Sequence, residues 1–287
     1  MFSQWFLVGP GRCGAQLARA MAAAGIRLVG IEARSLQGRV RARRAAPGTP
    51  VFGPDDALPP VPGVLLAVPD SAIAACAVAL APRLDPATTV VLHTSGLLPA
   101  DVLRPLARKG RHLGSLHPLV SFPTATGPAV ELRGAVATVE GDAAAVREAR
   151  ALAGALGMRP VSVAADAKPL YHAAAAVAAN LTHTLVATSK ALLVRAGFRE
   201  SGAAAALRPL VRGAVEAALT ARGIENLTGP LGRGDARAVR AHLDALPAAV
   251  AAAYRSAGAI AVDALEAQRL LSESQLQELR RALTLLP

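Results

Sequence analysis

The chain has 287 residues, of which 53% are hydrophobic and 18% charged, so it can bury a sizeable core and is not a disordered protein. The formal net charge is +11, but aromatic residues make up only 3% and the arginines are mostly scattered, which argues against a nucleic-acid-binding surface. The densest arginine cluster is Arg39, Arg41, Arg43 and Arg44. Two cysteines without framework spacing, Cys13 and Cys76, argue against a disulfide scaffold and a zinc site, and they favour a cytoplasmic location.

The sequence predicts neither a signal peptide nor a membrane-spanning helix. The N-terminus runs into a predicted strand within five residues and lacks the basic and apolar regions of a signal peptide. The longest apolar region, from Tyr171 to Val194, is rich in alanine and contains His172, Asn180 and Lys190. These polar residues favour a buried helix over a membrane span.

The first half of the chain alternates short apolar runs with helical segments. The strand at 5–8 stops at glycine, a helix follows at 12–24, and a second strand occupies 27–31. This order is a βαβ unit and implies a parallel sheet. Further strands are predicted at 63–68, 89–93, 112–116, 135–139 and 160–163, and further helices at 71–81, 99–109 and 143–156.

From Asp166 onward the sequence predicts only helices, at 166–196, 200–221, 235–243, 247–270 and 273–285. We therefore expect an α/β Rossmann domain with a mostly parallel sheet at 1–163 and an all-α domain for substrate binding and dimerisation at 164–287. The last two helices hold more alanine and leucine than one small helical domain needs. They predict a homodimer that forms through them.

A glycine-rich loop follows the first strand and carries the pattern Gly9-Pro10-Gly11-Arg12-Cys13-Gly14. The first glycine permits a tight turn, the second lets the backbone approach a pyrophosphate, and the third lets the helix pack on the strand. The position of the loop between a strand and a helix indicates a dinucleotide site, where the helix N-terminus favours phosphate.

The end of the second strand bears on the choice of cofactor. Glu32 favours NAD, because an acid at this place binds the ribose hydroxyls. Arg34 and Ser35 follow at once, and an arginine with a hydroxyl suits the 2′-phosphate of NADP. We expect NADP(H) on balance, with a solvated loop arginine as the alternative for Arg34.

Three further segments follow predicted strands, where open α/β sheets bind ligands. Val68-Pro69-Asp70 and Thr94-Ser95 are expected to contact cofactor, and Ser95 also substrate. Asp70 is equally interpretable as a helix N-cap. His117, in Gly114-Ser115-Leu116-His117-Pro118, is expected to face the cleft and to orient a substrate oxygen or act as an acid.

The start of the helical region carries a polar stripe. At 100° per residue, Lys168, His172, Asn180 and His183 share one helix face with small alanines between them, which suits the wall of a ligand cavity. Lys168 is one of three lysines, and it lies in the first turn of a helix, where the dipole disfavours a cation. Burial and the dipole would lower its pKa and help it protonate a developing alkoxide, unless it is a surface lysine.

Taken together, these segments and Leu227–Asp235 resemble a family of bacterial Rossmann-like oxidoreductases that carry a helical C-terminal domain known as domain of unknown function 2520. The family is related to 6-phosphogluconate dehydrogenase-like and ketopantoate reductase proteins. The resemblance spans essentially the whole chain. Lys168 matches the lysine of ketopantoate reductases, whereas His172 stands where they have asparagine, and Asn180 is a candidate substitute. The Gly-Ser-x-His-Pro segment is similar to that of prephenate dehydrogenases.

The resemblance implies an NADP(H)-dependent dehydrogenase or reductase that acts on a small 2-oxo or hydroxy acid, with 2-dehydropantoate as the first substrate to test. Lys168, Asn180, His117 and His172 are the expected catalytic residues. Arg233 is expected to hold the substrate carboxylate, unless it is only a partner of Asp235. The alternatives are a prephenate- or pyrroline-carboxylate-type dehydrogenase and a non-catalytic NADP(H)-binding sensor.

Overall fold

The computed structural model describes residues 2–284, and the described chain forms two compact units. The first unit ends at Asn180 and the second begins at Leu181. The sequence analysis sets the domain boundary near residue 163, where the strands end. The first unit runs further because the helix that begins at Lys168 buries that lysine against the sheet.

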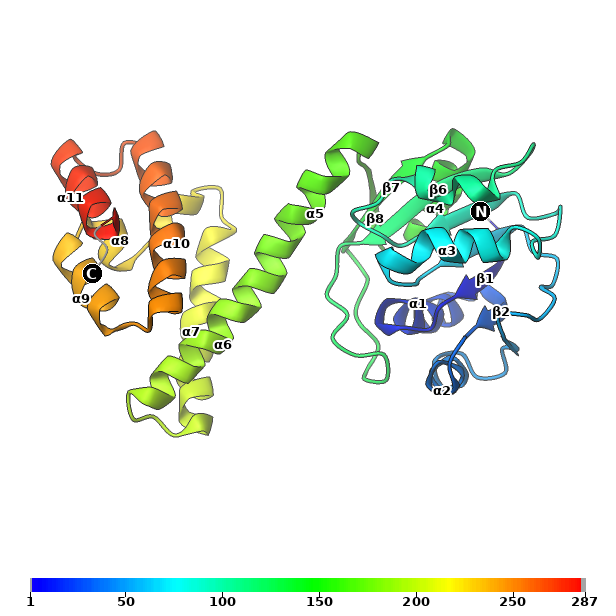
Figure 1. Ribbon diagram of the computed structural model, residues 1–287, viewed down its shortest axis with the longest axis horizontal. Coiled ribbons are helices and arrows are strands. Elements are labelled where there is room, and N and C mark those ends of the chain that lie inside the picture. Colours follow the sequence, from blue (N-terminus) through cyan, green and yellow to red (C-terminus); the bar gives the residue numbers. More distant parts are fainter. Residues whose placement is uncertain (1, 285–287) are drawn as a thin grey trace. The chain divides into compact units, whose positions relative to one another are not determined.

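The first unit is built on an eight-stranded sheet in the order β3-β2-β1-β4-β5-β6-β7-β8 (Figure 1). All neighbouring strands are parallel except β6 and β7, so the prediction of a mostly parallel Rossmann sheet is confirmed. The strands are β1 Gln4–Val8, β2 Arg27–Glu32, β3 Val51–Phe52, β4 Gly63–Leu66, β5 Val90–His93, β6 His112–Pro118, β7 Val136–Gly141 and β8 Arg159–Ser162.

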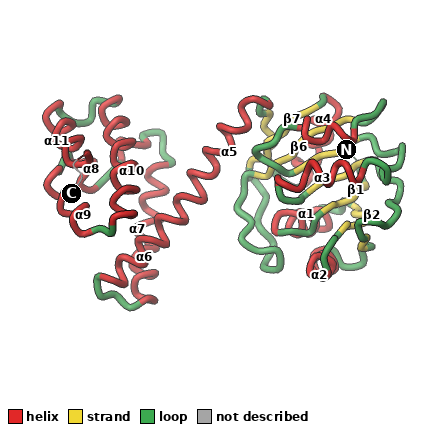
Figure 2. Tube along the Cα trace, viewed as in Figure 1, coloured by secondary structure: helices red, strands yellow, loops and turns green. Residues whose placement is uncertain are grey.

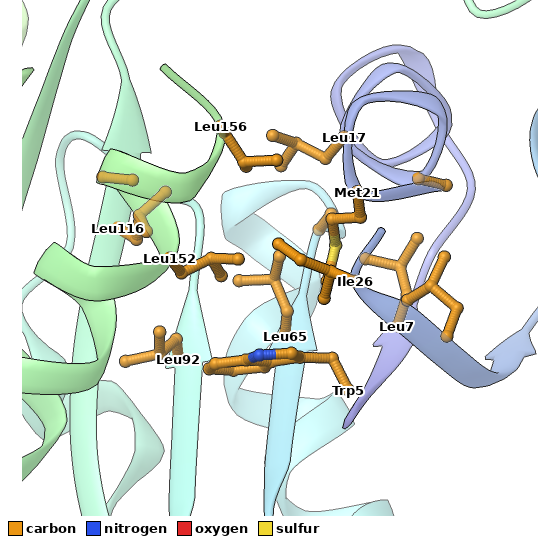
Figure 3. Packing of buried hydrophobic residues seen from close by; sticks show 14 of the residues in the cluster. Trp5, Leu7, Leu17, Met21, Ile26, Leu65, Leu92, Leu116, Leu152 and Leu156 are labelled. Carbon is orange, nitrogen blue, oxygen red and sulfur yellow. The ribbon is translucent and has the colours of Figure 1, made fainter. Parts of the chain in front are cut away.

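Both faces of this sheet are covered, because side chains alternate along each buried strand. Trp5 and Leu7 of β1 join the core beneath α1 (Arg12–Ala23), α2 (Leu36–Ala45) and α4 (Ala143–Ala155), as Figure 3 shows for part of that cluster. Phe6 and Val8 point to the other face, which α3 (Asp70–Leu80) and the 3₁₀ helix η1 (Ala100–Leu106) cover. The result is a three-layer arrangement.

Two elements of the first unit were not predicted, and one differs in kind. α2 escaped prediction because it is rich in arginine and contributes only Gly38, Ala42 and Ala45 to the buried surface. β3 has two residues, too few for a periodic signal. The helix expected at 99–109 is the short η1, which has Pro105 within it and therefore lacks a backbone N–H for an α-helical ladder.

After the sheet, the described chain is helical (Figure 2). The helix α5 (Lys168–Ala176) passes through a π turn, η3 (Val177–Leu181), into α6 (Thr182–Arg195). The second unit also contains α7 Glu200–Ala218, the 3₁₀ helix η4 Gly223–Asn226, α8 Gly229–Arg233, α9 Ala236–Ala245, α10 Ala248–Ala267 and α11 Glu273–Thr284. This confirms the predicted all-helical region, although α8 was expected to be a loop. The predicted end of the last helix at residue 285 lies outside the described residues.

The second unit has its own core, in which α9, α10 and α11 meet through Val239, Val262, Leu276 and Leu279. Among the helices that the structure describes, α10 alone is long enough and apolar enough to cross a membrane, judged by length and composition only. Its residues Ala251 and Val262 are buried in this core, and 22% of its apolar window is buried.

Candidate functional site

The glycine-rich loop joins β1 to α1 and uses its three glycines in three different ways. Gly9 has a φ of +91°, and a Cβ there would lie 2.8 Å from the carbonyl oxygen of Ala67. A Cβ on Gly14 would overlap the carbonyl oxygen of Gly9, so this glycine lets α1 pack against the loop. A Cβ on Gly11 would meet no protein atom closer than 4.0 Å.

The open space beside Gly11 fits a bound phosphate group. Gly11 is the N-cap of α1 and supplies no side chain to the first turn of the helix. The helix N-terminus therefore keeps unpaired N–H groups and the positive end of its dipole at this point. A dinucleotide is the ligand that this combination of close backbone approach and helix N-terminus accommodates.

The neighbouring strand ends lie against this loop. Val68 is within contact distance of the position of a Cβ on Gly9, and the Thr94 N–H donates to the Leu66 carbonyl at 3.0 Å. Burial raises the pKa of the Cys13 thiol to about 12, so this cysteine is an inert packing residue rather than a nucleophile. The segments after β1, β4 and β5 thus form one edge, as the sequence predicts.

Asp70 and Ser95 are joined by a side-chain hydrogen bond, with Ser95 buried and Asp70 half-buried. The Ser95 hydroxyl donates to the Asp70 carboxylate at 2.8 Å and accepts hydrogen bonds from the N–H groups of Leu97 and Leu98. Asp70 is the first residue of α3, whose N-cap is Pro69, and its side chain makes no capping bond. The alternative of a helix-capping Asp70 is therefore wrong. The Ser95 hydroxyl already has three protein partners, which gives it a structural part in the site.

At the end of β2 the three residues considered for cofactor choice differ in environment. Arg34 and Ser35 are exposed, and the Ser35 hydroxyl also accepts a hydrogen bond from the Gly38 N–H as the N-cap of α2. Glu32 is buried, and its Oε2 lies 2.8 Å from Nη2 of Arg83.

A row of polar side chains crosses the sheet on the face that α3 and η1 cover. His93 of β5 pairs in register with Ser115 of β6, and Ser115 pairs with Glu140 of β7. Directly opposed residues place their side chains on the same face. His117 lies two residues beyond Ser115 and therefore shares this face.

Lys168 inserts into this row from the first turn of α5. Its Nζ donates to the Ser115 hydroxyl at 2.9 Å and to the Ser95 carbonyl at 3.2 Å, and lies 3.9 Å from Oε2 of Glu140. The side chain is 2% exposed, and burial lowers its pKa, an effect that Glu140 and Asp70 oppose. This agrees with the predicted direction of the shift. The ammonium, however, is held by protein oxygens and is not among the groups that line the neighbouring cavity.

His93 is fixed as a neutral imidazole. Its Nδ1 accepts the Ser95 N–H at 3.1 Å, which leaves Nε2 to donate to the Pro99 carbonyl at 3.2 Å. Burial, and then the charge of Lys168, lower the pKa of His93 to about 4. This histidine holds the loop after β5 and has no exposed surface.

His117 stands at the wall of a cavity of about 550 Å³ within the first unit. Its Nδ1 lies 2.7 Å from the Tyr171 hydroxyl, and its ring meets those of Tyr171 and His172 edge to face. Burial, followed by His172 and Lys168, lowers the pKa of His117 to about 4, so the ring is neutral near pH 7. The lining residues are His117, Leu119, Val120, Ser121, Tyr171, His172, Ala174, Ala175, Ala176, Ala178, Ala179 and Asn180.

Gly96 lets the two imidazoles approach each other. A Cβ there would lie 2.9 Å from Cε1 of His117 and 2.9 Å from Cδ2 of His172. The segment after β5 is thus shaped around the two histidines. The cavity presents neutral hydrogen-bonding groups on an otherwise small and apolar wall, a combination typical of a small-molecule site.

The predicted polar stripe of the long helix is only partly realised. His172 and Asn180 line the cavity, whereas His183 belongs to the second unit and is not a lining residue. Asn180 lies in the π turn, where the wider turn interrupts the 100° spacing on which the predicted alignment depended. Arg233 is an exposed residue of α8 in the second unit, and Asp235 caps α9 through the Ala238 N–H.

Three residues of the site escaped the sequence analysis. Tyr171, beside His117, is one residue from His172, and only the pairing of α5 with the sheet reveals its role. Arg83 follows α3 and reaches Glu32. Arg41 of α2 donates from Nε to the Pro10 carbonyl at 3.0 Å and so supports the glycine loop. The cluster of arginines on α2 was the one available signal for Arg41.

Comparison with known families finds two matches, and the second begins inside the sheet of the first unit. Residues 5–118 match a Rossmann-like domain, and residues 135–260 match a domain of unknown function, DUF2520. No curated protein matches the sequence.

Several solved structures share the fold. A proposed NADP oxidoreductase from Bacteroides fragilis is 21% identical, with a TM-score of 0.73 over 90% of this chain and 96% of that chain. A protein from Thermotoga maritima is 23% identical, with a TM-score of 0.68 over 92% and 99%. The pyrroline carboxylate reductase of Plasmodium falciparum, with NADP bound, is 11% identical, with a TM-score of 0.58 over 98% and 95%. The protein therefore combines a Rossmann-like domain with a DUF2520 domain.

Proposed function

We propose that this protein is an NADP(H)-dependent oxidoreductase that transfers a hydride to or from a small 2-oxo or 2-hydroxy acid. The observation that carries the proposal is the glycine loop, in which Gly9 and Gly14 are required by packing while Gly11 leaves space for a ligand. The loop lies at the carboxyl edge of the sheet, the edge at which β6 places His117. Open α/β sheets bind ligands at that edge.

The cofactor contacts follow from the loop geometry. The N–H groups of the Gly9–Gly14 loop, at the start of α1, would hold the pyrophosphate, and Pro10, Arg12 and Cys13 shape that loop. Arg34 and Ser35 would bind a 2′-phosphate. The strand ends would border the rest of the dinucleotide through Val68, Pro69, Asp70, Thr94 and Ser95. When bound, the nicotinamide supplies or accepts the hydride.

His117 is the group best placed to act on the substrate oxygen. We assign to His117 the neutral tautomer in which Nδ1 accepts from the Tyr171 hydroxyl, 2.7 Å away. Its Nε2–H is then a donor that would polarise a carbonyl. The buried ammonium of Lys168 adds a positive field that favours negative charge developing on that oxygen. His172 and Asn180 would orient the substrate from the same cavity wall.

Further parts of the proposal concern the second unit and the cell. Arg233, an exposed residue of the second unit, stays the arginine predicted from the sequence to bind the substrate carboxylate. We also propose a cytoplasmic location, which suits the free cysteines Cys13 and Cys76. 2-Dehydropantoate is the substrate to test first, given the resemblance of Lys168 to the lysine of ketopantoate reductases.

A matched pair of histidine variants tests the role of His117. His117→Gln should lower kcat about 100-fold while the KM for NADPH stays within about 3-fold, because the lost group acts on substrate rather than on cofactor. His112→Gln is the control, since His112 lies at the other end of the same strand, outside the cavity. Equal activity of the two variants would show that His117 takes no part in the reaction.

The substrate is identified by following loss of NADPH absorbance with a panel of compounds. The panel contains 2-dehydropantoate, other 2-oxo acids and a cyclic imine, because the fold is shared with a pyrroline carboxylate reductase. Oxidation of NADPH with a 2-oxo acid supports the proposal. Oxidation of NADPH with the imine alone would show that the substrate is an imine and not a 2-oxo acid. Saturable NADPH binding without oxidation by any member would identify a non-catalytic sensor.

A further inference from the structure

The acidic residue at the end of β2 is close to the candidate dinucleotide loop. The backbone carbonyl of Glu32 accepts a hydrogen bond from the Gly9 N–H at 3.0 Å, so the two residues adjoin. The Glu32 side chain is 10% exposed. An acid at this place ordinarily binds the ribose hydroxyls of NAD and repels the 2′-phosphate of NADP.

Glu32 is not a free acid in this fold. Its Oε2 lies 2.8 Å from Nη2 of Arg83, a residue that follows α3, and the Arg83 side chain is 15% exposed. Two opposite charges at this distance and degree of burial interact much more strongly than an ion pair in water. Arg83 therefore offsets the negative charge that would otherwise face a 2′-phosphate.

The loop after β3 holds Arg83 in this position. The guanidinium donates to the carbonyl of Gly53 at 3.1 Å, and to the carbonyl of Asp56 from Nη2 at 2.9 Å and from Nε at 3.2 Å. The Asp56 carboxylate accepts the Gly53 N–H at 2.7 Å and fixes that loop in turn. Arg83 is thus positioned against Glu32 before any ligand binds.

We propose that Arg83 is a specificity-determining residue that makes the site accept NADP(H) by neutralising Glu32. The inference rests on the proposed function and extends it, because the preference for a 2′-phosphate then depends on an arginine outside β2 as well as on the exposed Arg34. Arg83 acts through Glu32 and not through contact with the phosphate. That distinction makes the proposal testable by combining substitutions.

The experiment measures the Kd of NADPH and of NADH by dinucleotide fluorescence for four proteins: wild type, Arg83→Met, Glu32→Gln and the double variant. In Arg83→Met the unpaired Glu32 should lower the NADPH-to-NADH affinity ratio by about 10- to 100-fold. Glu32→Gln should stay within about 3-fold of the wild-type ratio, because its charge is already neutralised. The double variant should match Glu32→Gln, since without the acid the arginine has nothing to neutralise.

The outcomes separate this inference from the proposed function. If Arg83→Met has an equal effect in wild type and in the Glu32→Gln background, Arg83 contacts the phosphate directly and the proposal is overturned. An unchanged NADPH-to-NADH affinity ratio in Arg83→Met would also overturn the proposal. A 10-fold change of that ratio in Glu32→Gln would overturn it too, and this variant can be measured even if Arg83→Met fails to fold. Wild-type protein that binds neither dinucleotide overturns both proposals. Arg104→Met, from an exposed ion pair with Asp101, controls for loss of a surface arginine.

Discussion

At the scale of single residues, the site includes a buried histidine, His93, whose hydrogen bonds are made inside the protein. His93 shows the consequence for charge. Its ring nitrogens are committed to the Ser95 N–H and the Pro99 carbonyl, so protonation would break a bond as well as place a charge in the interior. The neutral form is therefore favoured in the folded state.

This preference predicts how stability depends on pH. The pKa of His93 falls from 6.5 to about 4 on folding, so between these values the unfolded chain binds more protons than the folded chain. The contribution of His93 is complete above pH 6.5 and is lost as the pH falls towards 4. Between pH about 7.5 and about 5, wild type should lose about 2 kcal/mol more unfolding free energy than His93→Gln.

Urea unfolding of the two proteins at both pH values measures this difference. The comparison concerns the change with pH and not the stability itself, because His93→Gln also alters two hydrogen bonds. Other groups, including His117, titrate in both proteins, so their contributions cancel. Equal changes in wild type and variant would show that His93 is not held neutral.

At the scale of elements, the loop and helix that follow β1 contain one glycine that packing requires, Gly14, and one that leaves space for a ligand, Gly11. Gly11 has a φ of −73°, which any residue adopts, and space for a Cβ. Gly11→Ala should therefore fold as wild type does and lose at least about 10-fold in affinity for NADPH, because the new methyl group fills the space for the pyrophosphate. Gly14→Ala should lose binding and also about 2 kcal/mol of stability, since its Cβ meets the Gly9 carbonyl.

NADPH titration and thermal unfolding of each variant test this pair. Gly154→Ala is the matched control, because Gly154 lies in α4 of the same unit and a Cβ there has open space. It should keep NADPH binding and gain up to about 1 kcal/mol from helix propensity. Wild-type affinity in Gly11→Ala would place the dinucleotide elsewhere.

The same helix also holds a loop of the cavity. The Gln16 amide of α1 donates to the carbonyls of Thr124 and Pro128 and accepts the Val130 N–H. These residues belong to the connection between β6 and β7, whose first part, Leu119 to Ser121, lines the cavity beside His117. The helix α1 and the wall of the cavity are therefore parts of one packed structure.

At the scale of the whole molecule, the second unit exposes an apolar surface. The sequence predicts dimerisation through residues 247–285, where Val262, Leu276 and Leu279 are buried in the core of the unit and Ile260 and Leu270 are exposed. Large exposed apolar side chains are also found on or just after α6 and α7, including Leu185, Leu210 and Leu219. Soluble monomers rarely expose such surfaces. We propose a homodimer that forms through α6 and α7.

Sedimentation equilibrium tests the dimer, which should have about twice the chain mass of 29.1 kDa. Leu210→Glu, on α7, should give the monomer mass, whereas Ile260→Glu, on α10, should leave the dimer intact. Both side chains are large, apolar and exposed, so the pair differs mainly in location. A monomer mass for the wild type would contradict the dimer. A monomer for Ile260→Glu together with a dimer for Leu210→Glu would show that the dimer forms through α10.

The sequence by itself determined the two-part organisation and the glycine loop. Both depend on local information: alternating apolar runs, the spacing of Gly9, Gly11 and Gly14, and the change to helical periodicity after Asp166. α2 was missed because it buries little more than small side chains, which leave no apolar stripe to detect.

Only the tertiary structure decided which polar residues meet. The burial of Lys168 against Ser115, the pairing of His117 with Tyr171 and the neutralisation of Glu32 by Arg83 join residues that are far apart in the chain. No periodicity encodes such contacts, because they depend on strand register and on how α3 and α5 pack against the sheet. The π turn at Val177–Leu181 changed the expected stripe for the same reason, since a single widened turn rotates every later side chain.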